Sequence, residues 1–216
     1  RIGLFDGEGN YIDSHNIILL LLHYLHNYKG WSGKVATGFS STVKITQFCK
    51  MHDLELEVVP IGFKHICGLM VNEDILLGGE ESGGIAVKGH IPERDGIWNG
   101  LVLLQAMMET KKSLPELLNE VTKLVGEFSF QRIDLKLTEA KKHEVVRNCK
   151  VDKYTSFGDW KVERIENLDG WKYYFNEDEW LMIRPSGTEP VLRTYAEGKT
   201  KERAIAILES CHKEIL

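Results

Sequence analysis

The first 126 residues alternate short apolar runs with segments of helical periodicity. The apolar runs lie at about 34–37, 55–59 and 74–77 and predict strands. Helical periodicity is found at about 14–29, 42–51, 64–70 and 96–111, and Ser113 followed by Pro115 predicts the capped start of one more helix. Strands that alternate with helices indicate βαβ units around a parallel or mixed sheet. We therefore expect an N-terminal α/β domain.

Two of these helices carry further signals. Ser14 is the residue type that begins helices, so we expect it to be the N-cap of the first helix. In the helix at 96–111, four large apolar residues recur at helical spacing and fall on one stripe: Ile97, Leu101, Leu104 and Met108.

The pattern changes after about residue 126. Residues 133–137 alternate strictly between apolar and polar, as a half-buried strand does, and further strands are expected near 159–165, 170–175, 180–183 and 192–196. Helices are expected at about 140–149 and 201–215, the second with Ala204, Ile207, Leu208 and Cys211 facing inward. This predicts a smaller α+β domain with an antiparallel sheet. We place the domains at 1–126 and 127–216.

Composition limits the classes of function. The 216 residues are 43% hydrophobic and 27% charged, with a formal net charge of −5, which argues against a nucleic-acid or anionic-membrane surface. No apolar run reaches the roughly 18 residues of a membrane span. Cys49, Cys67, Cys149 and Cys211 lie far apart, so we expect reduced thiols and a cytoplasmic protein. His23 and His26 have no nearby cysteine and are expected on the exposed edge of their helix rather than at a zinc ion.

The segment 184–193, which follows the strand at 180–183, is the strongest candidate for chemistry. It reads RPSGTEPVLR and brings two guanidiniums, two hydroxyls and a glycine into ten residues. Arginine offers a planar fork of donors that matches a phosphate, and glycine lets backbone N–H groups approach an anion. The alternative is a surface turn with an ion pair between Arg184 and Glu189. In the phosphate-binding interpretation, the charge of Arg184 serves an external anion and has no partner in the core.

A second loop, 78–84, reads GGEESGG and follows the expected strand at 74–77. Its glycines leave room around two carboxylates and a serine, and carboxylate acceptors suit the adjacent hydroxyls of a sugar. In sheets built from βαβ units, ligands gather beyond the carboxyl ends of strands, where this loop would lie. The alternative is a flexible acidic turn.

Together the two loops resemble the α-D-phosphohexomutases, the phosphoglucomutase and phosphomannomutase family. Three further stretches, at 59–66, 90–97 and 169–180, fit that family in order and spacing. The resemblance extends over nearly the whole chain. It corresponds to the third and fourth of the family's four domains, so that an N-terminal half would precede this chain.

The resemblance implies an enzyme that interconverts hexose 1-phosphate and hexose 6-phosphate through a phosphoserine and a hexose 1,6-bisphosphate intermediate. The serine and an aspartate-rich Mg²⁺ loop belong to the preceding domains, and residues 1–12 resemble the stretch that begins at the last arginine of that loop. We therefore expect no catalytic residue, no metal ligand and no activity in this chain alone. Residues 6–9, DGEG, mimic the metal motif, but we interpret them as a turn between two strands. A non-catalytic phosphosugar-binding protein is the alternative function.

The resemblance also assigns roles to individual residues. Glu80 and Ser82 would bind sugar hydroxyls, and a distal phosphate would be held by Arg184, Ser186, Gly187, Thr188 and Arg193. Lys64 is a candidate for a charge contact with substrate, with an exposed helical lysine as the alternative. Arg94 either meets the phosphate or, as we prefer, forms an ion pair with Glu93 or Asp95. The partners implied are a hexose phosphate and the N-terminal domains, with no nucleic acid and no membrane. Glucose, mannose and glucosamine substrates stay open.

Overall fold

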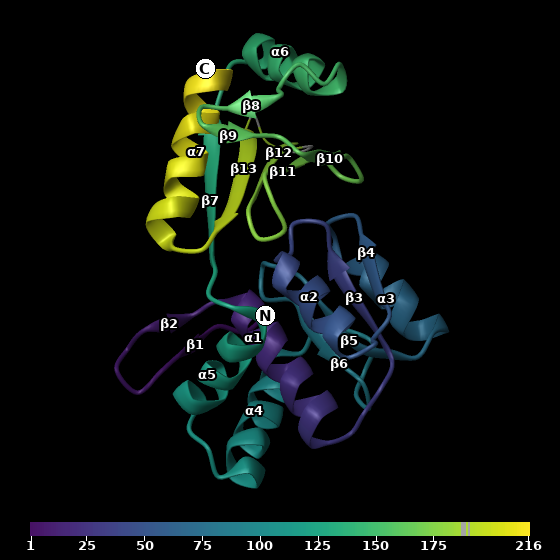
Figure 1. Cartoon of the computed structure of the whole chain (residues 1–216). Helices are drawn as coiled ribbons and strands as arrows, with labels where there is room; N and C mark the ends of the chain where they lie inside the picture. The colour runs from purple at the N-terminus through teal and green to yellow at the C-terminus, as the bar shows by residue number, and fades with distance from the viewer. Residues whose placement is uncertain (187–188, 190) are drawn as a thin grey trace. The chain divides into compact units, whose positions relative to one another are not determined.

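The computed structural model describes residues 1–186, 189 and 191–216, and these divide into two compact units, Arg1–Gly126 and Glu127–Leu216 (Figure 1). The first unit combines a mixed sheet with helices, and the second is built on a five-stranded antiparallel sheet. The predicted fold class, α/β followed by α+β, is confirmed.

The sheet of the first unit has four strands in the order β4-β3-β5-β6. Three of them are parallel: β3 (Lys34–Gly38), β4 (Leu56–Val59) and β5 (Ile75–Gly79). The fourth, β6 (Ile85–Val87), pairs with β5 in the antiparallel direction and was not predicted. Because β3, β4 and β5 run the same way, their carboxyl ends meet at one edge of the sheet.

The helices of this unit are α1 (Ser14–Leu22), α2 (Val43–Met51), α3 (Phe63–Asn72), α4 (Gly96–Thr110) and α5 (Leu114–Val125). Helix α1 is buried along almost its whole length and packs against α2, α4, α5 and β5. The predicted cap of α1 was one residue too late, since Asp13 is the N-cap and accepts from the N–H of Asn16 at 2.9 Å. The predicted start of α5 is confirmed, because Ser113 and Glu116 form a capping box.

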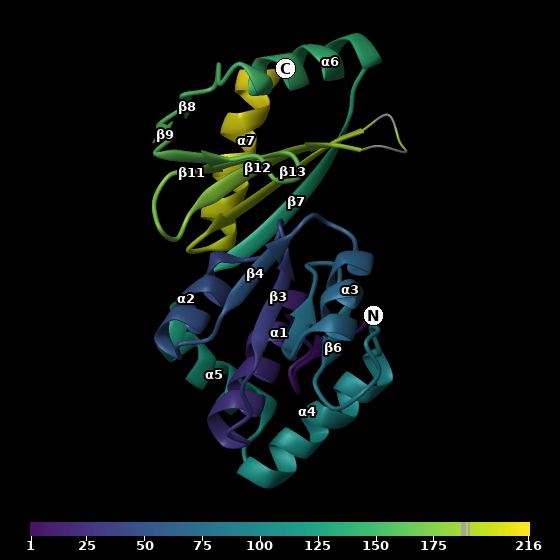
Figure 2. The same cartoon turned by 90° about the vertical axis from the view of Figure 1, so that its right-hand side faces the viewer.

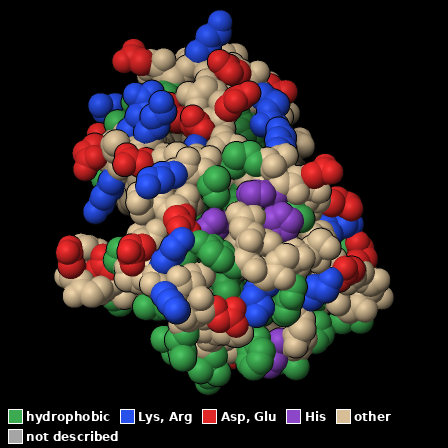
Figure 3. Space-filling view, turned by 60° about the horizontal axis from the view of Figure 1, so that its bottom comes forward, with side chains coloured by type: hydrophobic (Ala, Val, Ile, Leu, Met, Phe, Trp, Pro, Cys, Tyr) green, Lys and Arg blue, Asp and Glu red, His purple; other side chains and the backbone are tan. Residues whose placement is uncertain are grey.

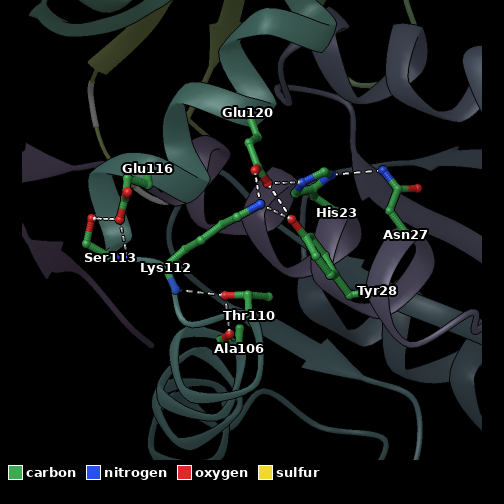
Figure 4. Close-up of polar contacts among 9 residues, drawn as sticks. All are labelled: His23, Asn27, Tyr28, Ala106, Thr110, Lys112, Ser113, Glu116 and Glu120. Carbon is green, nitrogen blue, oxygen red and sulfur yellow. Dashed lines mark hydrogen bonds and ion pairs between the residues drawn. The ribbon is translucent and has the colours of Figure 1, made fainter.

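The last turns of the predicted first helix form a π-helix, η1 (His23–Tyr28), and the prediction for His23 was wrong. His23 is buried, and its Nε2 lies 3.0 Å from Oε2 of Glu120 on α5 (Figure 4). Tyr28 and Lys112 also donate to Glu120. Burial opposes the ionisation of Glu120, but these hydrogen bonds outweigh it and hold its pKa at about 2. The cluster links η1 to α5 across 97 positions of sequence.

A small hairpin opens the chain. Strands β1 (Leu4–Phe5) and β2 (Tyr11–Ile12) pair with each other in a sheet of two strands, which projects from the rest of the first unit in Figure 1. Between them, Oδ1 of Asp6 accepts from the backbone N–H of Glu8 at 2.9 Å and of Asn10 at 2.8 Å. Residues 6–9 are therefore the turn that we predicted.

The sheet of the second unit has the order β10-β11-β12-β13-β7, entirely antiparallel. Its strands are β7 (Ser129–Lys136), β10 (Arg164–Glu166), β11 (Trp171–Tyr174), β12 (Trp180–Pro185) and β13 (Val191–Gly198), with a separate short pair, β8 (Ser156–Phe157) and β9 (Trp160–Lys161). The helices are α6 (Glu139–Lys150) and α7 (Lys201–Ile215).

Helix α7 packs along β7 and β13 (Figure 2). Its four predicted inward residues are all fully buried, and they close the core of this unit over aromatic side chains such as Phe157 and Tyr173. Burial of this apolar face is the main source of stability for such a small unit.

All four cysteines lie in the described part of the chain and are free thiols. Of the helices in that part, none combines the length and the apolar character that a membrane crossing requires.

Candidate functional site

The first candidate loop joins β5 to β6 at the carboxyl edge of the parallel strands. It runs from 80 to 84 and is closed by two backbone hydrogen bonds: the N–H of Glu80 donates to Gly84 O at 2.9 Å, and the N–H of Gly83 donates to Glu80 O at 3.1 Å. Gly83 has a φ of +84°, and a Cβ there would lie 2.7 Å from the carbonyl oxygen of Ile2. This position therefore requires glycine.

The other glycines of the sequence motif have different roles. Gly78 and Gly79 belong to β5, where side chains would overlap Ile66 of α3 and Ile18 of α1. They allow the two helices to pack closely on the sheet. We expected the glycines to leave room around the two carboxylates and the serine, but the first two belong to the strand, and only the second half of the motif shapes the loop.

The Glu80 carboxylate points inward. The residue is only 4% exposed, and its Oε1 accepts from the backbone N–H of Gly62 at 2.8 Å. Gly62 is the N-cap of α3, so Glu80 links the loop after β5 to the start of the helix that follows β4. Burial raises the pKa of Glu80, the charge of Glu81 adds to this, and the Gly62 N–H and the charges of Arg94 and Arg1 oppose it.

Ser82 is half-buried in the same loop, and Arg94 lies beside Gly84 at the end of that loop. The guanidinium of Arg94 covers the ring of Phe63 at 5.4 Å, and a Cβ on Gly84 would touch its Cδ. The preferred ion pair is present with Glu93, at 3.6 Å. Asp95, the other partner considered, instead caps α4 and bonds the ring of His90.

Lys64 is exposed in the first turn of α3, two positions after Gly62. The structure therefore brings the charge of Arg94 close to Glu80, whereas Lys64 is near it only through its position on the turn of α3 that follows Gly62.

Arg1 belongs to this neighbourhood and was given no role from sequence. The backbone N–H of Ile2 donates to Gly83 O at 3.1 Å, which fixes the start of the chain against the loop. The charge of Arg1 lowers the pKa of Glu80. The sequence did hold a signal that Arg1 belongs to the site, because the resemblance places Arg1 at the end of the family's metal loop.

The second candidate loop joins β12 to β13. Arg184 and Arg193 are direct cross-strand partners in this pair, so their side chains leave the same face of the sheet. Like charges opposite each other repel, and acidic residues compensate. Arg184 Nε donates to Asp169 Oδ1 at 3.0 Å, and Arg193 Nη2 donates to Glu189 Oε2 at 3.0 Å.

This pairing corrects two expectations. The ion pair considered between Arg184 and Glu189 is wrong, because Glu189 pairs with Arg193. The expectation that Arg184 lacks a partner is also wrong, since it bonds Asp169 with both side chains mostly buried. Arg193 has a further acidic neighbour, Asp134, 3.6 Å from its Nε. A phosphate at this face would have to compete with these carboxylates.

Ser186 closes the described part of the loop. Its N–H donates to Val191 O at 3.0 Å, and its Oγ accepts from the N–H of Glu189 at 3.2 Å. Lys142 of α6 donates to the carbonyl oxygens of Ser186 and Glu189 at 3.1 and 3.3 Å, a support that sequence reasoning missed. Gly187 and Thr188, which were also expected to bind phosphate, lie outside the described residues.

The carboxylates that the structure describes do not form a metal centre. Both oxygens of Asp6 are engaged by Glu8 and Asn10, and hydrogen bonds from Asn10 lower its pKa. Across the described ranges, no three His, Cys, Asp or Glu side chains come together as metal ligands would. The residues that the structure describes therefore do not fit the Mg²⁺ that the resemblance implies.

Comparison with known proteins agrees with this architecture. Residues 13–125 match the model of "Phosphoglucomutase/phosphomannomutase, alpha/beta/alpha domain III", and residues 133–211 match that of "Phosphoglucomutase/phosphomannomutase, C-terminal domain". The chain therefore belongs to the phosphoglucomutase/phosphomannomutase family, as the two loops had indicated.

Curated relatives share this similarity over nearly the whole chain. A phosphoglucosamine mutase of Limosilactobacillus reuteri is 31% identical over 199 residues, which are 91% of this chain and 40% of that protein. A phosphoglucosamine mutase of Fusobacterium nucleatum is 27% identical, over 94% of this chain and 41% of that protein. A phosphoglucomutase/phosphomannomutase of Thermococcus kodakarensis is 25% identical, over 97% and 43%.

Solved structures extend the match to the fold. A protein of Thermus thermophilus, provisionally named a phosphomannomutase, superimposes with a TM-score of 0.82 at 28% identity, over 100% of this chain and 43% of that one. The chain thus spans about two-fifths of the length of the relatives it matches.

Proposed function

We propose that this chain is the sugar- and phosphate-binding half of a phosphohexomutase, which interconverts hexose 1-phosphate and hexose 6-phosphate. The observation that carries the proposal is the pairing of Arg184 with Arg193 across β12 and β13. Two guanidiniums on one face of the sheet offer several N–H donors that suit a phosphate, which would compete for them with Asp169 and Glu189. Ser186 adds a hydroxyl at the same loop.

The first loop is suited to the sugar. Glu80 offers carboxylate acceptors for adjacent hydroxyls, and Ser82 can donate or accept beside it. The Gly62 N–H holds the carboxylate in place before a ligand arrives, and such pre-organisation lowers the cost of binding. Arg94 and Lys64 would add positive charge near the sugar phosphate.

The chemistry itself belongs to the domains that precede this half. There we place the phosphoserine, the Mg²⁺ and the hexose 1,6-bisphosphate intermediate. The residues of this chain hold the sugar and the phosphate that is not reacting. Binding energy from such remote contacts serves catalysis by positioning the reacting end.

Calorimetric titration of the 216-residue chain with glucose 6-phosphate tests the binding proposal, with glucose and inorganic phosphate as separate ligands. We expect Arg193→Ala to weaken glucose 6-phosphate binding by about 10- to 150-fold, from the loss of ~1.5–3 kcal/mol of charge-assisted hydrogen bonds. Arg147→Ala, on the exposed side of α6 in the same unit, is the matched control and should leave the affinity unchanged. Equal affinities for wild type and Arg193→Ala would contradict the proposal.

A further inference from the structure

Helix α4 is apolar on two opposite faces. Its inner face is buried in the first unit through Val102, Leu103 and Ala106. The predicted stripe, which would ordinarily be the face that packs on a core, points to solvent: Ile97 is 82% exposed and Met108 79%, with Leu101 and Leu104 exposed between them. A helix that is hydrophobic all round is normally buried on all sides.

This outer face is part of a larger apolar surface. It borders a groove of about 870 Å³ whose other walls come from Leu4 and Phe5 of β1 and from Leu114 and Pro115 at the start of α5. In Figure 3, hydrophobic side chains gather along the lower edge of the view, over the end of the first unit at which α4 lies. Contiguous apolar patches of this kind mark interaction sites.

The apolar surface continues onto the β1–β2 hairpin. Phe5 and Tyr11 are both exposed, and their rings contact each other with centroids 5.4 Å apart. The sheet that holds them has only the two strands β1 and β2, within the described residues. A two-stranded sheet is marginally stable in water and gains stability when more structure packs on it.

We propose that this surface, made of the outer face of α4, the β1–β2 hairpin and the groove between them, is the docking site of the polypeptide that precedes Arg1 in the full-length protein. Leu4 and Phe5 lie within a few residues of Arg1, so the preceding chain emerges directly beside the groove. The relatives supply the occupant, because this chain matches 41% of the Fusobacterium nucleatum protein and its two parts match a third and a C-terminal domain.

The proposal concerns the assembly of the protein and is independent of the sugar and phosphate loops. None of the residues named for substrate belongs to the docking surface. A failure of substrate binding would therefore leave this inference intact, and the reverse also holds.

Cysteine labelling tests the proposal in the full-length protein and in the 216-residue chain. The background carries Cys67→Ser, because the three other cysteines are buried. Leu101→Cys then reports on the docking surface, and Val71→Cys, at a 68% exposed position of α3, is the matched control. We expect Leu101→Cys to react at least about tenfold more slowly in the full-length protein than in the chain, as covered sites do, and Val71→Cys to react equally in both.

Two labelling results would overturn the proposal. Equal reactivity of Leu101→Cys in both proteins would show that the surface stays open. Slow labelling in the 216-residue chain, with a mass that doubles as concentration rises, would show that a second copy covers it.

A charge substitution gives an independent measurement. Ile97→Glu should leave the Tm of the 216-residue chain unchanged, because the side chain is exposed there, and should lower the Tm of the full-length protein. Val71→Glu should have no such differential effect. An unchanged full-length Tm with Ile97→Glu would contradict the docking.

Discussion

Replacement of Glu80 separates its role in the fold from its role toward a sugar. The carboxylate is 4% exposed and accepts one charge-assisted hydrogen bond, from Gly62 N–H at 2.8 Å. Glu80→Gln keeps an acceptor for that N–H and removes the buried charge. Glu80→Ala removes both the acceptor and the charge.

The sign of the stability effect follows from the raised pKa of Glu80. The unfolded chain releases this proton near pH 4.3, whereas the folded chain releases it at a higher pH. Between these two values the folded state binds more protons, so the contribution of Glu80 to the unfolding free energy falls as the pH rises. At neutral pH the ionised, buried carboxylate is therefore a cost to the fold. We expect Glu80→Gln to keep or raise the Tm at pH 7, and Glu80→Ala to lower it because the Gly62 N–H is left without its acceptor.

Activity should fall in both variants, including Glu80→Gln, whose Tm we expect to be kept or raised. Loss of carboxylate hydrogen bonds to hydroxyls, ~1.5–3 kcal/mol, corresponds to a fall of kcat/KM by about 10- to 150-fold in the full-length enzyme for both variants. Thermal melting and a coupled assay of hexose 1-phosphate conversion measure the two effects. Glu55→Gln, at a largely exposed carboxylate, is the matched control and should change neither. Unchanged kinetics in a folded Glu80→Gln protein would show that the loop is structural, and a large drop in its Tm would refute the account of the buried charge.

Three further variants test other parts of the structure. Arg184→Ala should weaken hexose phosphate binding by about 10- to 150-fold and also lower the Tm, because Asp169 loses its hydrogen bond to the Arg184 guanidinium; a lower Tm with intact affinity would make Arg184 purely structural. Asp95→Ala removes the N-cap of α4 and should cost about 0.5–2 kcal/mol of unfolding free energy in urea, with Asp95→Asn recovering most of it; equal stability of all three proteins would contradict this. Burial lowers the pKa of Lys172, which lies 3.7 Å from the ring of Trp180, so the unfolded chain binds this proton at higher pH than the folded chain does. The unfolding free energy of wild type should therefore rise relative to Lys172→Met as the pH approaches about 10.4, and a difference independent of pH would contradict this reasoning.

Local patterns predicted much of the fold. Helix α7 begins and ends where its periodicity indicated, with the predicted face buried, because the spacing of apolar residues reports directly on a single long amphipathic helix. The start of α5 was equally easy to predict, since the two residues of its capping box lie only three positions apart. Strand β6 was missed because it has only three residues and depends on its pairing with β5.

What the sequence could not predict depends on residues far apart in the chain. The polar residues around His23 are typical of an exposed helix edge. His23 is nevertheless buried, and its ring bonds the carboxylate of Glu120, 97 positions away in the chain. The stripe on α4 was visible, but periodicity cannot tell a face that packs on its own unit from one that packs on something else.

In the candidate site, too, local patterns were predictable and contacts between distant residues were not. The loop residues were identified by type, since glycines, carboxylates and arginines in close succession indicate binding. The acidic partner of Arg184, the lysine of α6 that supports Ser186 and the Gly62 N–H that holds Glu80 became apparent only when the strands were assembled. These contacts decide how much charge the site presents to a ligand.

Conversion of hexose 1-phosphates tests the central claim most directly. The full-length protein and the 216-residue chain are each supplied with the 1-phosphates of glucose, mannose and glucosamine, with Mg²⁺ and a trace of hexose 1,6-bisphosphate, and formation of the 6-phosphate is followed. We predict that the full-length protein converts at least one of them and that the 216-residue chain converts none above a contaminant control. Conversion by the chain alone would contradict the placement of the chemistry in the preceding domains. Binding without conversion by the full-length protein would show a phosphosugar-binding protein instead of a mutase.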